Sequence, residues 1–223
     1  MSLRPESALL AAVLVIASCS ADPAEPVDSI PPAEGATSPT EAVTELVAAV
    51  NVPDFADASR LAVPGHAALA SLAEGATFGD VAEALREGDQ EVAANFWAGF
   101  AQGAGTFLTG DIGVSEGGTV SRDDVEFHQV SVSTEDGGNR TVLIQESNGY
   151  RVDLFASFGA GLADKMIGPV ERLLNTQTDD ARLILATLRE IVPSLLVASE
   201  LPGTSGDVSQ RLLALVEVIT RVG

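Results

Sequence analysis

The sequence contains few of the residues from which most active sites are built. Its 223 residues include one cysteine, two histidines, one tyrosine, one tryptophan and a single lysine, Lys165. Most metal sites and nucleophile–base pairs depend on cysteine or histidine. We therefore expect no metal site, no catalytic residue and no cofactor, and a protein that is not an enzyme.

Positive charge is also scarce. The chain has 12 Lys and Arg against 32 Asp and Glu, which gives a formal net charge of -20. Nucleic-acid binding requires basic side chains that neutralise phosphates, so we expect no nucleic-acid partner. Hydrophobic residues make up 46% of the chain, which is too many for a protein that stays disordered throughout.

The first residues have the layout of a leader for export. Arg4 precedes an apolar run from residue 8 to residue 17, and this run ends in small residues. A helix of ten residues rises about 15 Å, whereas the bilayer hydrocarbon is roughly 30 Å thick, so the run is too short to span a membrane. We expect residues 1–18 to be a signal peptide.

The leader ends in Ile16-Ala17-Ser18-Cys19, which resembles the lipobox of bacterial lipoproteins. The resemblance implies cleavage between Ser18 and Cys19, a diacylglycerol on the Cys19 thiol, and further acylation such as palmitate. It implies an extracytoplasmic protein that is attached to the bacterial cell membrane by a lipid anchor. The alternative is an ordinary signal peptide in which Cys19 is a passive small residue. With no second cysteine, the exported domain forms no internal disulfide and depends on its core for stability.

We interpret residues 19–37 as the lipidated N-terminus followed by a disordered acidic tether. This stretch holds four prolines and four acidic residues, and its only large apolar residues are Val27 and Ile30. Such a segment buries too little surface to offset its ordering entropy. Order is expected to begin at Ser38, because Ser38, Pro39 and Glu41 match the pattern of a capped helix start.

Residues 38–223 predict a single α+β domain: a helical N-terminal part, an antiparallel β-meander and a helical C-terminal part. Apolar spacing predicts helices near 40–50, 54–63, 67–73, 78–86 and 90–101, and then over 162–174, 178–193 and from Ser205 or Asp207 onward. Strands are predicted at 107–108, 112–114, 120–133, 141–145 and 150–155. Asn148-Gly149 predicts a type I′ hairpin turn with positive φ at both positions.

A helical start followed by Asn148-Gly149-Tyr150-Arg151-Val152 resembles the exported domains of the NTF2-like (cystatin-like cone) superfamily. The resemblance covers residues 38–155 and leaves 156–223 as a helical extension. It implies a curved sheet whose open end takes a small ligand. No functional residue is carried over from it.

The two histidines are the remaining candidates for chemistry. His128 has several acidic residues nearby, among them Glu126, which would allow a carboxylate–histidine pair. We expect the strand to point these two side chains to opposite faces. His66 follows Pro64-Gly65 and is expected at a helix start, in a capping or surface role.

Four aromatic residues are predicted to line a ligand pocket: Trp97, Phe100, Phe127 and Tyr150. Ordinary core packing is the other explanation for them. We expect a membrane-anchored cell-envelope lipoprotein that binds an apolar small molecule, a lipid or an envelope protein without catalysis.

Two alternatives remain open at this point. An NTF2-like enzyme would use a pocket acid or histidine, and it would bring His128 and an acidic side chain together in a concave pocket. A structural envelope protein would instead expose a large apolar patch for assembly.

Overall fold

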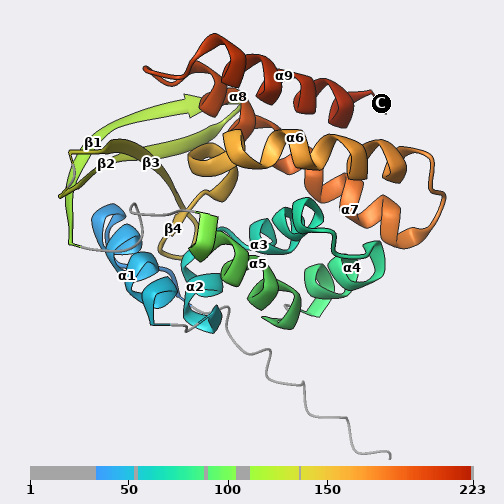
Figure 1. Ribbon diagram of the computed structural model, residues 1–223, viewed down its shortest axis with the longest axis horizontal. Coiled ribbons are helices and arrows are strands. Elements are labelled where there is room, and N and C mark those ends of the chain that lie inside the picture. The colour runs from blue at the N-terminus through green and yellow to red at the C-terminus, as the bar shows by residue number, and fades with distance from the viewer. Residues whose placement is uncertain (1–33, 53–54, 88–89, 104–110, 136, 222–223) are drawn as a thin grey trace, which may run out of the picture. The chain divides into compact units, whose positions relative to one another are not determined.

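The computed structural model describes residues 34–52, 55–87, 90–103, 111–135 and 137–221 (Figure 1). These described residues belong to one compact unit. The predicted signal peptide, Cys19, the tether up to residue 33 and the predicted strand at 107–108 lie outside the described residues.

The N-terminal part is helical, as predicted. It contains α1 (Pro39–Asn51), α2 (Phe55–Leu61), α3 (His66–Ala70), the 3-10 helix η1 (Ser71–Glu74), α4 (Phe78–Glu87) and α5 (Gln90–Gly103). The cap predicted at Ser38 is confirmed, because Ser38 Oγ accepts a hydrogen bond of 3.2 Å from the backbone N–H of Glu41.

Four antiparallel strands form the sheet in the order β1-β2-β3-β4, which confirms the meander. They are β1 (Ile112–Arg122), β2 (Val125–Thr134), β3 (Asn139–Glu146) and β4 (Tyr150–Val152). The prediction of one strand over 120–133 is wrong, because Asp123 and Asp124 form a hairpin turn between β1 and β2 with φ of 48° and 67°. Aspartate tolerates positive φ, but it marks such a turn less clearly than glycine does.

The turn predicted at Asn148-Gly149 is confirmed, with φ of 49° and 98°. The strand after it is shorter than predicted and ends at Val152. Asp153 then caps the long helix α6 (Leu154–Leu174), because its Oδ1 accepts a hydrogen bond of 2.8 Å from the backbone N–H of Ala156. The capping side chain thus ends the strand and begins the helix several residues earlier than apolar spacing suggests.

Three further helices complete the C-terminal part: α7 (Asp179–Glu190), α8 (Val192–Glu200) and α9 (Gly206–Thr220). Thr178 and Ser205 cap α7 and α9, and Pro193 lies in the first turn of α8, where its missing N–H costs nothing. Helices α6, α8 and α9 pack against one another (Figure 1). Across the described ranges, no helix is both long and apolar enough to cross a membrane.

The sheet is covered on both faces. Val142 and Ile144 of β3 belong to the main core, which includes the apolar face of α1. Leu143, between them, packs with Ala156 of α6 and Val197 of α8 in a second cluster. Successive strand residues point to opposite faces, so this continuously apolar strand is buried on both sides, as its sequence predicts.

The described chain begins with a short segment that pairs with β4, although the sequence placed residues 34–37 in the tether. The backbone N–H of Gly35 donates to the carbonyl of Asn148 at 2.8 Å. Ala36 and Tyr150 exchange backbone hydrogen bonds of 3.0 and 2.9 Å, and Ala36 is buried. We call residues 34–37 the N-terminal dock.

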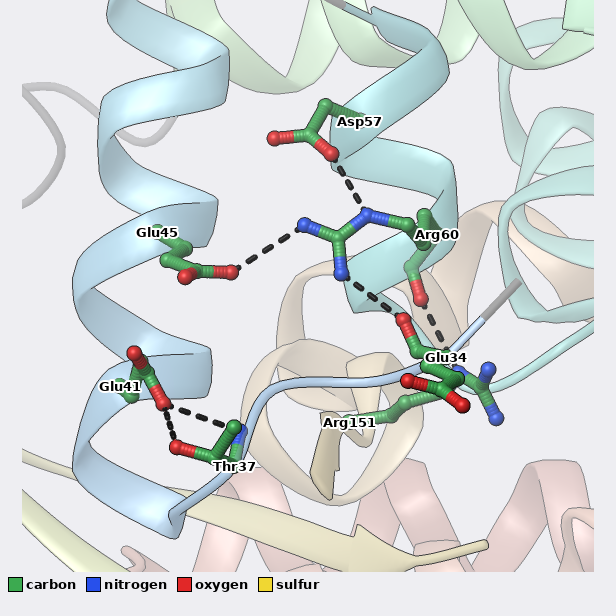
Figure 2. A network of polar contacts seen from close by, with 7 residues as sticks. All are labelled: Glu34, Thr37, Glu41, Glu45, Asp57, Arg60 and Arg151. Carbon is green, nitrogen blue, oxygen red and sulfur yellow. Dashed lines mark hydrogen bonds and ion pairs between the residues drawn. The ribbon is translucent and has the colours of Figure 1, made fainter. Parts of the chain in front are cut away.

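Arg60 of α2 holds the N-terminal dock in place through hydrogen bonds (Figure 2). Its guanidinium donates to the backbone carbonyl of Glu34 at 2.8 Å, to Asp57 at 2.6 Å and to Glu45 of α1 at 3.2 Å. The hydrogen bond to Asp57, helped by Glu45, raises the pKa of Arg60. Arg151 Nε donates to the carbonyl of Arg60 at 3.0 Å, and burial lowers the pKa of Arg151. The folded domain therefore includes residues that precede its first helix.

Candidate functional site

A cleft of about 870 Å³ opens beside the first turns of α6. Its walls come from η1, α5, strands β2 and β3, the start of α6, the loop between α8 and α9, and α9 itself. Pockets of roughly 300–1,000 Å³ are typical of small-molecule sites. We call this feature the α6 cleft.

One wall of the α6 cleft is aromatic. Phe100 of α5 meets Phe158 of α6 edge to face, with ring centroids 5.0 Å apart. Phe100 also lies 5.5 Å from Phe96 and 5.4 Å from the fully buried Trp97, measured between ring centroids. The apolar wall is therefore continuous with the core and touches the chain's single tryptophan.

Three of the described lining residues are charged: Glu74, Arg140 and Lys165. Lys165 Nζ lies 2.9 Å from Glu74 Oε1, and both side chains are more than a third exposed. The guanidinium carbon of Arg140 lies 5.6 Å from the ring centroid of Phe158, within range of a cation–π contact. Charged groups thus border the aromatic wall.

Two glycines of α6 shape the same cleft. A Cβ on Gly159 would lie 3.3 Å from side-chain carbons of Leu195 and Leu212, so this glycine lets α6 pack closely against α8 and α9. A Cβ on Gly161 would meet nothing within 4 Å. The absence of a side chain at position 161 leaves part of the cleft open.

The structure places the four predicted pocket aromatics in three different surroundings. Phe100 lines the α6 cleft, and Trp97 lies behind it in the core. Phe127 is fully buried in the second cluster, whereas Tyr150 packs against His128 with ring centroids 5.3 Å apart. Phe127 and His128 are consecutive strand residues, so they lie on opposite faces of the sheet. The four aromatic residues therefore do not line one pocket.

The expected orientation of His128 is wrong. Residues two apart in a strand share a face, and His128 Nε2 lies 3.7 Å from Glu126 Oε1. The Glu126 side chain is 61% exposed, and neither residue is among those that line the α6 cleft. His128 Nε2 itself is buried and accepts or donates no hydrogen bond among the described residues. The pair meets at the sheet surface and not in this cleft.

A buried polar cluster centred on Asp153 was not predicted from the sequence. Asp153 is fully buried, and its Oδ2 accepts hydrogen bonds of 2.6 Å from Gln145 Nε2 and from Ser194 Oγ. His66, expected at a helix start in a capping or surface role, begins α3 but is buried as well, with Nδ1 3.5 Å from Asp153 Oδ1. The cluster joins α3, β3, α6 and α8. The alternation of apolar and polar residues from Tyr150 onward predicted that Asp153 faces solvent, so no local pattern indicated its burial.

The geometry of this cluster suits a structural role. Ser194 Oγ donates to the Asp153 carboxylate and His66 Nδ1 also faces Asp153, so the imidazole does not stand between serine and aspartate as it does in a Ser–His–Asp triad. Burial lowers the pKa of His66, although the nearby Asp153 opposes this, and the imidazole packs edge to face on Phe155 at 5.1 Å. Such a network fixes the relative positions of the elements that it joins.

Metal ligands do not gather in the described part of the chain, where no group of three or more His, Cys, Asp or Glu could hold an ion.

In comparisons with known proteins, the chain matched no family model, no curated protein and no solved structure.

Proposed function

We propose that the chain is a lipid-anchored protein of the bacterial cell envelope whose domain binds a small amphipathic molecule in the α6 cleft without catalysis. The cleft is the observation that carries the binding function, because it combines an aromatic wall, charged groups and a volume suited to a small ligand. The sequence Ile16-Ala17-Ser18-Cys19 supports the anchor.

The groups in the α6 cleft favour binding over catalysis. Neither histidine is among the residues that line it, and the acidic side chain described there, Glu74, is paired with Lys165. General acid–base catalysis needs a group that can exchange a proton with the substrate near the working pH. A carboxylate held in an ion pair of partly exposed side chains is less suited to exchanging protons with a substrate than to positioning a ligand.

The described surface gives little support to a purely structural envelope protein. Its exposed large hydrophobic residues are Val52, at the end of α1, and Leu213 of α9, at 73% and 44% exposure. Assembly surfaces are usually contiguous apolar patches of several hundred Å². Two single residues on separate helices do not form such a patch.

The N-terminal dock and the α6 cleft lie at opposite ends of β3. Gly35 bonds to Asn148, just beyond the C-terminal end of the strand, whereas Arg140 borders the cleft near its start. At about 3.3 Å per residue, residues 140 and 146 are roughly 20 Å apart. The described chain therefore enters the domain at the end of β3 away from the cleft.

Mass spectrometry of small molecules that co-purify with the full chain tests the binding function. Gly161→Leu is the blocking variant, because Gly161 lines the cleft, a Cβ there meets nothing within 4 Å, and leucine favours the helix. Gly79→Leu on α4 is the matched control: it lies outside the cleft lining, and its Cβ would be in ordinary contact 3.8 Å from Thr77. We expect the ligand with the wild type and the control, and not with Gly161→Leu. Equal amounts with all three would contradict the proposal.

The anchor has its own test. Cys19→Ala removes the thiol that would carry the diacylglycerol, so we expect the variant to leave the membrane fraction or to remain unprocessed. Processing and detergent partitioning like those of the wild type would refute the anchor and leave the binding function standing.

A further inference from the structure

Among its described lining residues, the α6 cleft carries a net charge opposite in sign to that of the whole chain. Acidic residues outnumber basic ones by 32 to 12 in the sequence, yet the charged residues described in the cleft lining are two basic and one acidic. The single lysine of the chain, Lys165, is one of them. The described lining thus has one positive charge in excess in a strongly acidic protein, which favours a negatively charged group on the ligand.

The basic groups come from separate elements and border one apolar wall. Arg140 stands on β3 with its guanidinium near the Phe158 ring, whereas Lys165 stands on α6 and reaches across to Glu74 of η1. Phe100 continues the apolar wall from Phe158. A ligand that contacts this wall therefore presents its polar end to positive charge.

We infer that the ligand of the α6 cleft is an amphipathic anion: a molecule with an apolar or aromatic body and one carboxylate-like group. The body packs on Phe100 and Phe158, and the acidic group binds the guanidinium of Arg140. A guanidinium has five N–H donors in a planar fork and binds carboxylates well alongside other contacts. Lys165 adds a second positive charge, and Glu74 disfavours a second acidic group at its own side of the cleft. This inference rests on the proposed binding function.

Three probes that differ only in their polar end test the inference: phenyloctanoate, phenyloctanol and phenyloctylammonium. Each is titrated by calorimetry into the full chain in lipid nanodiscs, with empty nanodiscs as the blank. Trp97 provides an independent fluorescence signal because it contacts Phe100. We expect phenyloctanoate to bind at least about tenfold more tightly than phenyloctanol, since a hydrogen bond to a charged group commonly contributes that much. Phenyloctylammonium should bind least well.

Charge-removing variants identify the residues responsible. Arg140→Gln should lower the affinity for phenyloctanoate about tenfold and leave that for phenyloctanol unchanged. Lys165→Gln, on another element, should weaken phenyloctanoate severalfold. Arg182→Gln is the matched control, because Arg182 lies on α7, outside the cleft lining, and pairs with Asp179 of its own helix. Far-UV circular dichroism checks that each variant is folded, and Arg140→Lys, which keeps the charge, should retain part of the preference.

The outcomes separate this inference from the proposed function. If phenyloctanol or phenyloctylammonium binds as tightly as phenyloctanoate, the cleft binds small molecules but the anionic class is wrong. If the preference for phenyloctanoate survives both Arg140→Gln and Lys165→Gln, the cleft charges do not recognise the ligand and the inference falls. If none of the probes binds, the inference also falls, and the co-purification experiment with Gly161→Leu decides the binding function separately.

Discussion

Replacing Gly149 by alanine should destabilise the domain for two separable reasons. Gly149 has a φ of 98°, a conformation that costs residues with a Cβ about 1 kcal/mol or more. An added Cβ would also lie 2.7 Å from the Cα and the N of Gly35, which is too close for any backbone atom. The same substitution therefore strains the turn and pushes away the N-terminal dock.

The magnitude follows from the bonds that the dock makes. If it lifts from β4, it loses the hydrogen bond from Gly35 to Asn148 and the two that Ala36 and Tyr150 exchange. At about 1 kcal/mol each, and with part of them retained by adjustment, the loss is about 2 kcal/mol. Together with the turn strain, Gly149→Ala should cost about 3 kcal/mol and lower the Tm by roughly 6–12 °C.

Matched variants separate the two causes. Gly75→Ala tests positive φ alone, because Gly75 has a φ of 90° and a Cβ there meets nothing within 4 Å; we expect a loss of about 1 kcal/mol. Gly35→Ala tests the close approach alone and should cost about 2 kcal/mol, since its Cβ would lie 2.8 Å from Gly149 C. Asn148→Gly should be close to neutral.

Urea unfolding followed by far-UV circular dichroism gives all of these values. The double variant Gly35→Ala/Gly149→Ala should cost less than the sum of the single variants, because the dock can be lost only once. Equal losses for Gly149→Ala and Gly75→Ala, or a Gly35→Ala variant as stable as the wild type, would show that the glycine contact does not hold the dock.

Two further predictions concern the interior and the cleft. Burial lowers the pKa of His66 in the folded state. Below the unfolded-state pKa of about 6.5, the unfolded state therefore binds more protons than the folded state. The free energy of unfolding should be highest above that pH and should fall as the pH drops through it. His66→Leu should flatten this part of the stability profile measured by urea unfolding from pH 7.5 to 5, and an unchanged slope would refute the assignment. Gly161→Ala should raise stability by about 0.5–1 kcal/mol, because it replaces a helical glycine at an open position. Gly159→Ala should gain nothing or lose stability, because its Cβ must displace two buried leucine side chains; equal gains at both sites in thermal unfolding would contradict this packing.

The sequence by itself determined the features that depend on near neighbours. Ser38, Thr178 and Ser205 each cap a helix by accepting from a backbone N–H three residues later, and that spacing is visible in the chain. Asn148-Gly149 likewise specifies its turn through the φ angles that these two residue types tolerate. The order of helices, meander and helices could therefore be predicted, with errors where a signal was weak, as at Asp123-Asp124.

The burial of polar residues and of the N-terminal dock was decided only by the tertiary structure. Asp153 and His66 have polar side chains in positions that look exposed, and they are buried because partners far along the chain, such as Ser194, lie against them. The N-terminal dock looks like part of a tether until β4 and Arg60 supply its hydrogen bonds. Short-range patterns cannot report such contacts, because the free energy of burying a polar or proline-flanked segment depends on which distant groups surround it.

The α6 cleft shows the same division. Its aromatic content was visible in the sequence, and Phe100 was among the expected lining residues. Its charged border was not, since Glu74, Arg140 and Lys165 lie on η1, β3 and α6 and have no common spacing in the chain. Composition thus determined that positive charge is rare, whereas the packing of α6 between the sheet and the helices decided where two of the rare positive charges meet an apolar wall.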